Sequence, residues 1–553
     1  MKKMLLLMLL AGAIAMFAAC GGNGDAPPPA PAGQQGQVTG DAAADDTEAV
    51  VPHVVEMGDA LVLPLTTEDV TFTVWGNEAG AFSAGLDRLS DSPWYQELMR
   101  RTGITVEWIH PPVGGDQENL NLLIFSGDLP DVVNISGAGG GGMIPGGMAQ
   151  GIVDGFIVDI TEMAERYAPY YWELIHADED RRREVFTDLG LLPGFWQVNI
   201  DLQPPWFGLM TRQDWLDDLG LEMPVTFDDW HHALSLFRDE KGATAPMLLR
   251  NTGFHLFHAF HAAFDFTEGF FQIDGRVTHG TLEPGFRDYV TMMAEWYAEG
   301  LIDPDFSGRA FFFGPQDLTT TGISGLFPDM YVMIPVLNMV AGDPDYRAVA
   351  IPPPVRYVGQ TVHLGQRAGH AGFIMLVTNN NHDPILWTRL MNYLYSPEGM
   401  LFANWGIEGE HFVFGPDGFP QFTPFMYDNP DGWSLHNVQR RYTRGPIGGF
   451  GYDWRRELTP GIEPDVLAAP YIWATNVDYA FMLPPITLTP EEGVENARIM
   501  TDVDTHRDEM VARFITGAEP LENFDNFVQT LRNMGIERAI ELQQNALDRF
   551  NAR

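Results

Sequence analysis

The chain of 553 residues has a single cysteine, Cys20, so it cannot form an internal disulfide. An exported protein stabilised by disulfides needs at least two cysteines, and a lone one near the start indicates an attachment point rather than a redox or catalytic group. Long apolar runs are missing too. No segment after the first twenty residues reaches the ~18 consecutive apolar residues of a membrane-spanning helix.

Basic residues are scarce. The 32 Lys and Arg stand against 75 Asp and Glu, which gives a net charge of −43, and Lys241 is the only lysine beyond the first three residues. So acidic a surface repels the phosphate backbone of nucleic acids and anionic lipid headgroups. The composition therefore excludes nucleic-acid binding and disfavours an anionic substrate, while the excess of acid is typical of a well-solvated surface.

The first twenty residues have the three parts of a secretory signal. A short basic start is followed by an apolar stretch at 4–17, and Ala18 and Ala19 precede Cys20. This ending resembles a lipobox, in which the cysteine is acylated and becomes the new N-terminus, although Phe17 stands where leucine is usual. We expect a signal peptide at 1–19 and acyl chains such as palmitate on Cys20. The alternative is an ordinary signal peptide that happens to contain a cysteine.

Residues 20–67 differ in composition from everything that follows. They combine a proline-rich piece, a Gly/Gln-rich piece and an acidic run without aromatic residues. Such a segment cannot bury enough apolar surface to fold. We therefore expect a flexible tether between a lipidated Cys20 and the folded body, with the protein held on the extracytoplasmic face of the cell membrane by its lipid anchor alone.

The body opens with alternating strand and helix patterns. They run in the order strand 70–75, helix 93–102, strand 104–109, helix 119–125 and strand 131–135. This β-α-β-α-β order predicts a mostly parallel sheet with helices on its faces. Ligands of such sheets bind at the carboxyl ends of the strands. Trp75, Asn77 and Glu78 would lie there.

Aromatic residues are abundant, with 14 Trp, 16 Tyr and 36 Phe making up 12% of the chain. Most of them must be core. The flat face of a sugar ring also packs on an aromatic ring, so this excess of tryptophan in an exported protein fits sugar recognition.

Three histidines at a spacing of three residues suggest a metal site, namely His255, His258 and His261. On a helix such steps drift by about 60° each around the axis, and a fourth ligand is not evident. We therefore expect a packed aromatic helix in this segment, with no metal and no other cofactor in the protein.

Several motifs follow one another along the body in a characteristic order and at characteristic spacings. They are LNLLIFSGDLPDVV at 120–133, GIVDGFIVDITEMAERYAPYY at 151–171, TRQDWLDDLGLEMPVTFDDWHHALSLFRD at 211–239, AEWYAEGLIDPDF at 294–306, MNYLYSPEGMLFANWGIEGEHFVF at 391–414 and FITGAEPLENFDNFVQTLRNMGIERAIELQQNALDRF at 514–550. Together they resemble the extracellular solute-binding proteins (family 1 type) of carbohydrate ABC importers. The likeness runs from about residue 68 onward.

The resemblance implies an α/β, two-lobe periplasmic-binding-protein-like (type II) fold with a hinge between the lobes. The first lobe would comprise 68–200 and 350–400, and the second 201–349 and 401–553. Hinge closure around a ligand is a known mode of conformational change. The resemblance further implies a monomer that captures a solute, an oligosaccharide above all, between its lobes and delivers it to ABC permease subunits.

The candidate ligand contacts are aromatic platforms together with polar groups that bind hydroxyls. They are Trp75, Asn77, Glu78, Asp128, Trp206, His255, Trp405, Glu410, Trp454 and Trp473. The rival function is that of a membrane-anchored glycoside hydrolase, which needs two carboxylates at a fixed separation around the scissile bond. The sequence shows no such signature, so we expect no catalytic residues.

Overall fold

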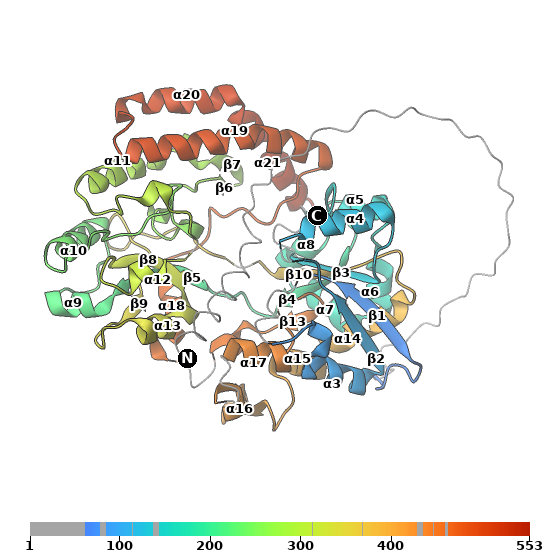
Figure 1. The fold of residues 1–553 in the computed structure, drawn as a ribbon. Coiled ribbons are helices and arrows are strands. Elements are labelled where there is room, and N and C mark those ends of the chain that lie inside the picture. The colour runs from blue at the N-terminus through green and yellow to red at the C-terminus, as the bar shows by residue number, and fades with distance from the viewer. Residues whose placement is uncertain are drawn as a thin grey trace.

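The computed structural model describes residues 61–77, 85–112, 114–136, 143–311, 313–367, 369–428, 435–445, 447–458 and 463–553. The expected signal peptide, Cys20, most of the expected tether and Glu78 lie outside these residues. Figure 1 shows two lobes side by side, each with its own sheet and surrounding helices. Among the described helices, none is both long enough and apolar enough to cross a membrane.

The first lobe is built on a six-stranded sheet with the order β13-β4-β10-β3-β1-β2. Its strands are β1 (Val70–Trp75), β2 (Ile104–Ile109), β3 (Val132–Ser136), β4 (Gly194–Asn199), β10 (Ala371–Val377) and β13 (Phe450–Tyr452). β1 pairs in parallel with β2 and β3, as the sequence predicts, whereas β10 runs antiparallel between β3 and β4.

Helices pack against this sheet (Figure 1). They are α3 (Pro93–Thr102), α4 (Asp116–Ser126), α5 (Gly147–Val153), α6 (Thr161–Tyr167), α7 (Pro169–His176), α8 (Glu179–Val185), α14 (Pro384–Tyr395) and α15 (Pro397–Trp405). Local chemistry sets their ends. The Ser92 hydroxyl accepts a hydrogen bond from the Tyr95 backbone N–H at the start of α3, and Gly103 ends that helix at a φ of 75°, where glycine is favoured.

A small satellite follows α15 on the first lobe. It consists of β11 (Phe412–Phe414), β12 (Pro420–Phe422), α16 (Pro424–Tyr427) and α17 (Leu435–Tyr442). These elements enclose a separate cluster of buried apolar residues that contains Trp405.

The second lobe has a three-stranded antiparallel sheet with the order β8-β5-β9, and a separate hairpin of β6 and β7. The strands are β5 (Phe207–Arg212), β6 (Phe270–Ile273), β7 (Arg276–His279), β8 (Leu326–Met330) and β9 (Ala348–Ala350). Its helices are α9 (Gln213–Leu219), α10 (Phe227–Asp239), α11 (Pro284–Ala298), α12 (Gln316–Thr319), α13 (Ile334–Val340), α18 (Pro464–Trp473), α19 (Pro490–Ile515), α20 (Phe524–Met534) and α21 (Ile536–Asn551).

Two stretches of the chain lie in the lobe opposite to the one predicted. Residues 401–458 belong to the first lobe, because β13 pairs with β4 and the Trp94 indole donates to the Phe402 carbonyl. Residues 350–366 belong to the second lobe, where Val355 bridges Thr226. The predicted boundaries at 350 and 401 are therefore wrong. Both lobes repeat the same α/β patterns, so local sequence does not mark where the chain changes lobe.

In the hinge, two segments of the described chain pass between the lobes side by side, residues 200–206 and, apart from residue 368, residues 366–370. A third crossing follows from the change of lobe between Leu458 and α18. The Asn199 backbone N–H and side-chain amide donate to the carbonyls of His370 (2.8 Å) and Gly369 (2.6 Å). On the second-lobe side, the Gln366 side-chain oxygen accepts from the backbone N–H groups of Trp206 (2.8 Å) and Phe207 (3.0 Å). The two crossing segments are therefore fastened to each other at both ends.

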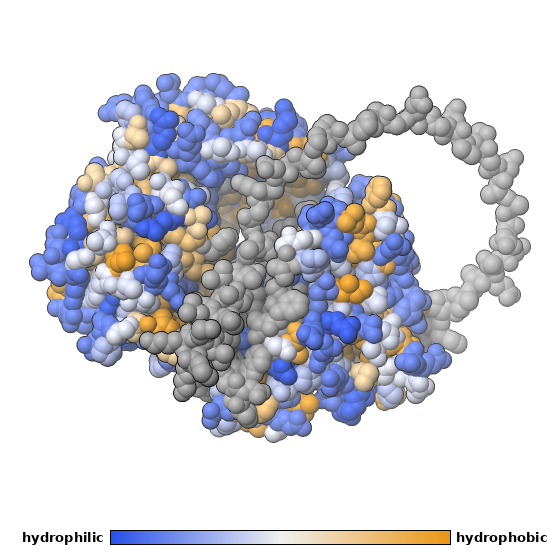
Figure 2. Space-filling view, viewed as in Figure 1, coloured by the Kyte–Doolittle hydropathy of each residue, from blue (hydrophilic) through white to orange (hydrophobic). Residues whose placement is uncertain are grey.

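The surface of both lobes is mainly hydrophilic on the face shown in Figure 2, with apolar residues scattered singly or in small groups. This agrees with the large excess of acidic residues in the sequence.

Candidate functional site

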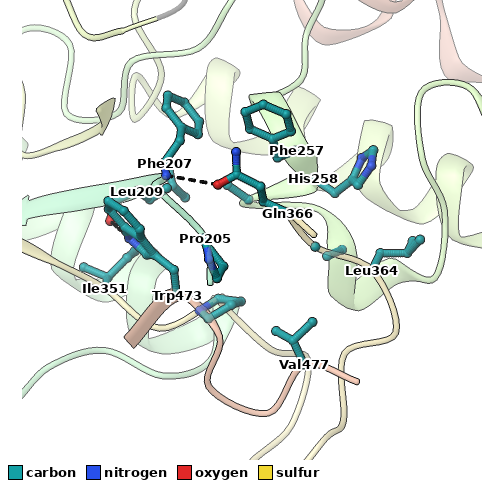
Figure 3. Close-up of a pocket in the computed structure, with 15 residues that line it drawn as sticks. Pro205, Phe207, Leu209, Phe257, His258, Ile351, Leu364, Gln366, Trp473 and Val477 are labelled. Carbon is teal, nitrogen blue, oxygen red and sulfur yellow. Dashed lines mark hydrogen bonds between the residues drawn. The ribbon is translucent and has the colours of Figure 1, made fainter. Parts of the chain in front are cut away.

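A pocket lies where β5 begins, directly beside the hinge (Figure 3). Its walls come from segments far apart in the sequence and are mostly apolar. They include Pro205, Phe207, Gly208, Phe257, His258, Ile351, Leu364, Gln366, Trp473 and Val477. A largely apolar cavity with a few polar groups next to a hinge is the usual form of a small-molecule site.

Trp473, the last residue of α18, forms one wall of this pocket. Its indole N–H donates to the Leu209 carbonyl at 2.9 Å. The ring lies against the backbone of Gly208, where an added Cβ would come within 2.5 Å of the ring atoms. Glycine is therefore required at this position for Trp473 to lie against β5. The Trp473 side chain is 5% exposed and belongs to a buried cluster of the second lobe, so little of its ring is accessible in this conformation.

Gln366 supplies the main polar group. Its oxygen is used by the hinge, as described above, whereas its side-chain nitrogen is buried and has no hydrogen-bond partner among the described residues. A buried donor without a partner carries a free-energy cost of about 1–3 kcal/mol. A ligand hydroxyl that accepted this hydrogen bond would remove the cost, so Gln366 is a candidate ligand contact.

A cluster of aromatic rings closes the pocket near the hinge. Phe257 lies 5.6 Å from both Trp206 and Phe207, measured between ring centroids, with edge-to-face geometry. Phe257 and its neighbour His258 have φ angles of 52° and 62°, a left-handed conformation that is uncommon outside glycine. Such residues concentrate at functional sites.

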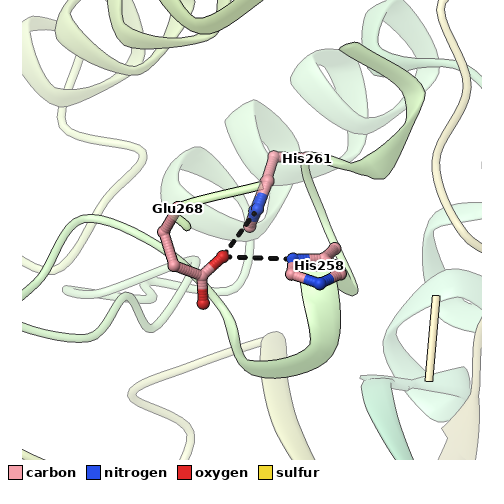
Figure 4. A group of neighbouring side chains, drawn as sticks. All are labelled: His258, His261 and Glu268. Carbon is pink, nitrogen blue, oxygen red and sulfur yellow. Dashed lines mark hydrogen bonds and ion pairs between the residues drawn. The ribbon is translucent and has the colours of Figure 1, made fainter. Parts of the chain in front are cut away.

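The predicted aromatic helix around the three histidines is wrong. The structure has two single turns of 3-10 helix, Leu256–His258 and Ala262–Phe264, and the left-handed residues interrupt the segment. The chain therefore folds back on itself here, and His258 and His261 both approach the carboxylate of Glu268 (Figure 4). Glu268 lies seven residues beyond His261, so a straight helix through the three histidines does not bring it to His258.

Asp329 lies behind the pocket wall, opposite Gly208 in the register of β5 and β8. It is 1% exposed, and its carboxylate accepts from the Met330 backbone N–H at 2.8 Å. Burial raises the pKa of Asp329 to about 8, because the ionised carboxylate loses its hydration.

Three predicted contacts lie in the interior of the lobes. Trp75 is 1% exposed, and its indole N–H donates to the Asn119 side chain at 2.8 Å. His255 is fully buried beside the Leu248 carbonyl, and burial lowers its pKa to about 3. Trp405 packs in the satellite cluster. In this conformation these side chains have no surface to offer a ligand.

The other predicted contacts fall into two groups. Asn77, Asp128 and Glu410 are exposed on the first lobe, where Asn77 donates to the Asp116 carboxylate. Trp454 lies with the core of the first lobe at 9% exposure. Trp473 lines the pocket and Trp206 contacts its aromatic cluster, so the structure brings these two together.

Sequence reasoning missed Phe207, Gly208, Phe257 and Gln366. Only their juxtaposition reveals them, because 159 residues separate Gln366 from the Phe207 amide it binds. Neither residue is part of a local motif.

Comparison with known proteins gives a consistent assignment of the fold. No protein-family model matches the chain. The sequence is 20% identical over 488 residues to the fructooligosaccharide ABC transporter substrate-binding protein FusA of Streptococcus pneumoniae, covering 83% of this chain and 87% of that protein. It is also 25% identical over 237 residues to the lipoprotein LipO of Bacillus subtilis, covering 39% and 42% of the two chains.

Solved structures are similar over almost their whole length. An HMO-binding, ABC-transporter-associated solute-binding protein from Bifidobacterium longum infantis matches with a TM-score of 0.67 at 15% identity, covering 87% of this chain and 99% of the other. The alginate-binding protein AlgQ2 matches with a TM-score of 0.66 at 21% identity, covering 88% and 99%. These likenesses confirm the expected fold class. The homologues confirm the resemblance to ABC transporter substrate-binding proteins.

Proposed function

We propose that this chain is the substrate-binding lipoprotein of a carbohydrate ABC importer, which captures an extracellular oligosaccharide between its two lobes and delivers it to permease subunits. The observation that carries the proposal is the likeness to FusA, a fructooligosaccharide-binding relative, over 83% of the chain. One structure of that relative contains kestose and has a TM-score of 0.65 to this chain.

The chemistry of the pocket supports a sugar ligand. Trp473 lines the pocket, and the C–H face of a pyranose or furanose ring would pack on its indole. Its ring is 5% exposed in this conformation, so the pocket must widen for a sugar to reach it. Gln366 offers a buried amide donor for a hydroxyl. A neutral ligand with alternating apolar faces and hydroxyl groups satisfies both, whereas a purely apolar ligand would leave the Gln366 amide without a partner.

The site extends beyond this pocket when the lobes approach each other. Each lobe contributes half of a site between them, so ligand binds the closed form more tightly and shifts the population toward it. Trp206 and Trp473 are the contacts of the second lobe. Asn77, Asp128 and Glu410 are exposed on the first lobe, and hydroxyl groups of a longer glycan are suitable partners for them.

The proposed anchor is Cys20, acylated on the extracytoplasmic face of the membrane. Two observations support it: the signal-like start that ends in the single cysteine, and the similarity to LipO, which is a lipoprotein. The tether would then hold the folded lobes within reach of the permease as a monomer.

Hydrolysis is the competing function, and the pocket argues against it. A glycoside hydrolase needs two carboxyl groups about 5–9.5 Å apart on either side of the bond. Among the described residues that line the pocket there is no Asp or Glu. We therefore propose binding without cleavage.

A glycan array combined with an assay for released reducing ends tests the proposal. The purified full chain is titrated against the array, and each bound glycan is then incubated with the protein and analysed by mass spectrometry. Saturable binding of neutral oligosaccharides, with the glycan recovered intact, is expected. Release of product in excess of the protein present would establish a hydrolase instead, and the absence of saturable binding to any glycan would contradict the carbohydrate assignment.

A further inference from the structure

His258, His261 and Glu268 form a compact group beside the pocket (Figure 4). His258 Nδ1 lies 3.1 Å and His261 Nε2 lies 3.3 Å from the same oxygen, Glu268 Oε2. All three potential ligand atoms lie within 4.8 Å of one another. The group is well shielded from solvent, because the side chains of His258, His261 and Glu268 are 15%, 0% and 29% exposed.

His261 is the unusual member. Its side chain is fully buried, its Nδ1 makes no hydrogen bond to a described residue, and its Nε2 contacts Glu268 Oε2 at 3.3 Å. Its ring stacks on Phe266 and contacts Tyr289 and Phe254, so apolar rings surround it, and one nitrogen is directed at Glu268. Buried polar atoms without partners are rare and call for an explanation, such as an ion that completes the site.

The observed spacing fits a small tetrahedral ion. Zinc binds imidazole nitrogen and carboxylate oxygen at about 2.0–2.2 Å, which separates neighbouring ligand atoms in a tetrahedron by about 3.3–3.5 Å. The two nitrogen–oxygen separations, 3.1 and 3.3 Å, are close to this value, and the two imidazole nitrogens lie within 4.8 Å of each other. Two nitrogens and one oxygen are also the donor set of zinc and related transition metals rather than of calcium or magnesium, which take oxygen ligands.

The surroundings support such a site. Thr267, which is 3% exposed, caps the turn before Gly269 through its hydroxyl and so fixes the backbone next to Glu268. Arg507 donates to the Glu268 carbonyl at 2.6 Å, and its charge is balanced by Asp504 and Asp508. His258 lines the pocket, so an ion has a path from solvent to the group.

We propose that His258, His261 and Glu268 bind a divalent transition-metal ion, with zinc as the expected ion, at the edge of the pocket. These three ligands would fill three of the four positions of a tetrahedral zinc ion, and water would take the fourth. If the proposed function is correct, a sugar hydroxyl can take the place of that water. The metal site itself does not depend on the sugar.

Metal binding by the full chain tests this directly. The protein is purified in detergent without a polyhistidine tag, stripped with chelator, and titrated with Zn²⁺ in the absence of any glycan. Isothermal titration gives the affinity, elemental analysis after dialysis gives the stoichiometry, and Co²⁺ substitution reports the geometry, because tetrahedral Co²⁺ absorbs visible light far more strongly than octahedral Co²⁺.

We expect one tightly held Zn²⁺ per chain and a tetrahedral Co²⁺ spectrum. His258→Gln and Glu268→Gln should each weaken binding at least tenfold. The matched control is His231→Gln, because His231 Nε2 pairs with the exposed Glu299 at 2.8 Å and, among the described residues, belongs to no group of three potential metal ligands. That control should bind metal as the parent does.

Two results would overturn the site. One is the absence of a stoichiometric metal ion in the parent protein. The other is undiminished binding in His258→Gln, a partly exposed position where the variant is expected to fold, with thermal unfolding in chelator as the check. In either case the group is an ordinary histidine–carboxylate ion pair. Because no glycan is present, neither result bears on sugar binding.

Discussion

Gly208→Ala is the perturbation that most selectively displaces the aromatic wall of the pocket. A Cβ at this position would stand 2.5 Å from Cδ1, Cε2 and Nε1 of Trp473. Carbon atoms in contact are about 3.5–4.0 Å apart, so the indole must move by about 1 Å or more. The φ angle of Gly208 is not in the left-handed region, so the effect comes from the contact and not from backbone strain.

The substitution should change both the free energy of unfolding and the free energy of sugar binding. Overpacking of a well-filled interior costs about 1–3 kcal/mol of stability. The displaced ring also loses its fit to a bound sugar, since a gap of 0.5–1 Å forfeits roughly a quarter to a half of each contact. A stacked ring contributes about 0.5–1.5 kcal/mol beyond the area it buries. With the loss of the indole hydrogen bond, we expect a Kd increase of about fivefold to thirtyfold.

Gly325→Ala is the matched control. A Cβ there would stand 2.3 Å from the ring of Phe237, so it too forces an aromatic side chain aside, but Gly325 does not line the pocket. Both variants are compared by urea unfolding and by calorimetric titration with the tightest-binding glycan of the array. Equal losses of stability with an unchanged Kd in Gly208→Ala would refute the role of Trp473 as a ligand platform.

Three further predictions concern the anchor, a buried acid and the hinge. Cys20→Ala, expressed in a bacterial host, should move the protein from the membrane fraction to the soluble fraction; equal membrane binding of variant and parent would contradict lipidation. Burial raises the pKa of Asp329 to about 8, so the folded protein binds more protons at this group than the unfolded chain between about pH 4 and 8, and stability falls as the pH rises through that window. Asp329→Asn retains the acceptor for the Met330 N–H and should remove that slope. In urea unfolding its free energy of unfolding should exceed that of the parent at pH 8 by an amount on the order of 5 kcal/mol and match it near pH 4; a parallel pH profile would show that Asp329 is ionised in the folded state. Saturating glycan should reduce the radius of gyration in small-angle scattering and shift tryptophan emission, and an unchanged radius at saturation would count against hinge closure.

The fold follows from the sequence where its signals are local. The strands at 70–75 and 104–109 alternate between apolar and polar residues, and Ser92 and Thr226 are standard helix caps, so each element forms where the sequence places it. The crossings between the lobes, by contrast, do not follow from local signals. They depend on pairings such as β13 with β4, which join residues more than 200 positions apart.

The site follows from the sequence much less well, for a physical reason. The rule that ligands lie at the ends of strands selects the last residue of β1, but it does not fix which face that side chain takes, and Trp75 is buried in the core. The segment at 255–264 shows the same limit. Its aromatic spacing suggests a helix, whereas the left-handed conformations of Phe257 and His258 arise from tertiary contacts that no local pattern encodes.

The most direct test of the account is a crystal structure of the protein with the tightest-binding neutral oligosaccharide. The account predicts an intact glycan enclosed between the two lobes, with one sugar ring stacked on Trp473 and a hydroxyl within hydrogen-bond distance of the Gln366 side-chain nitrogen. A glycan bound on an outer surface, or one that leaves both residues untouched in a site elsewhere, would contradict it.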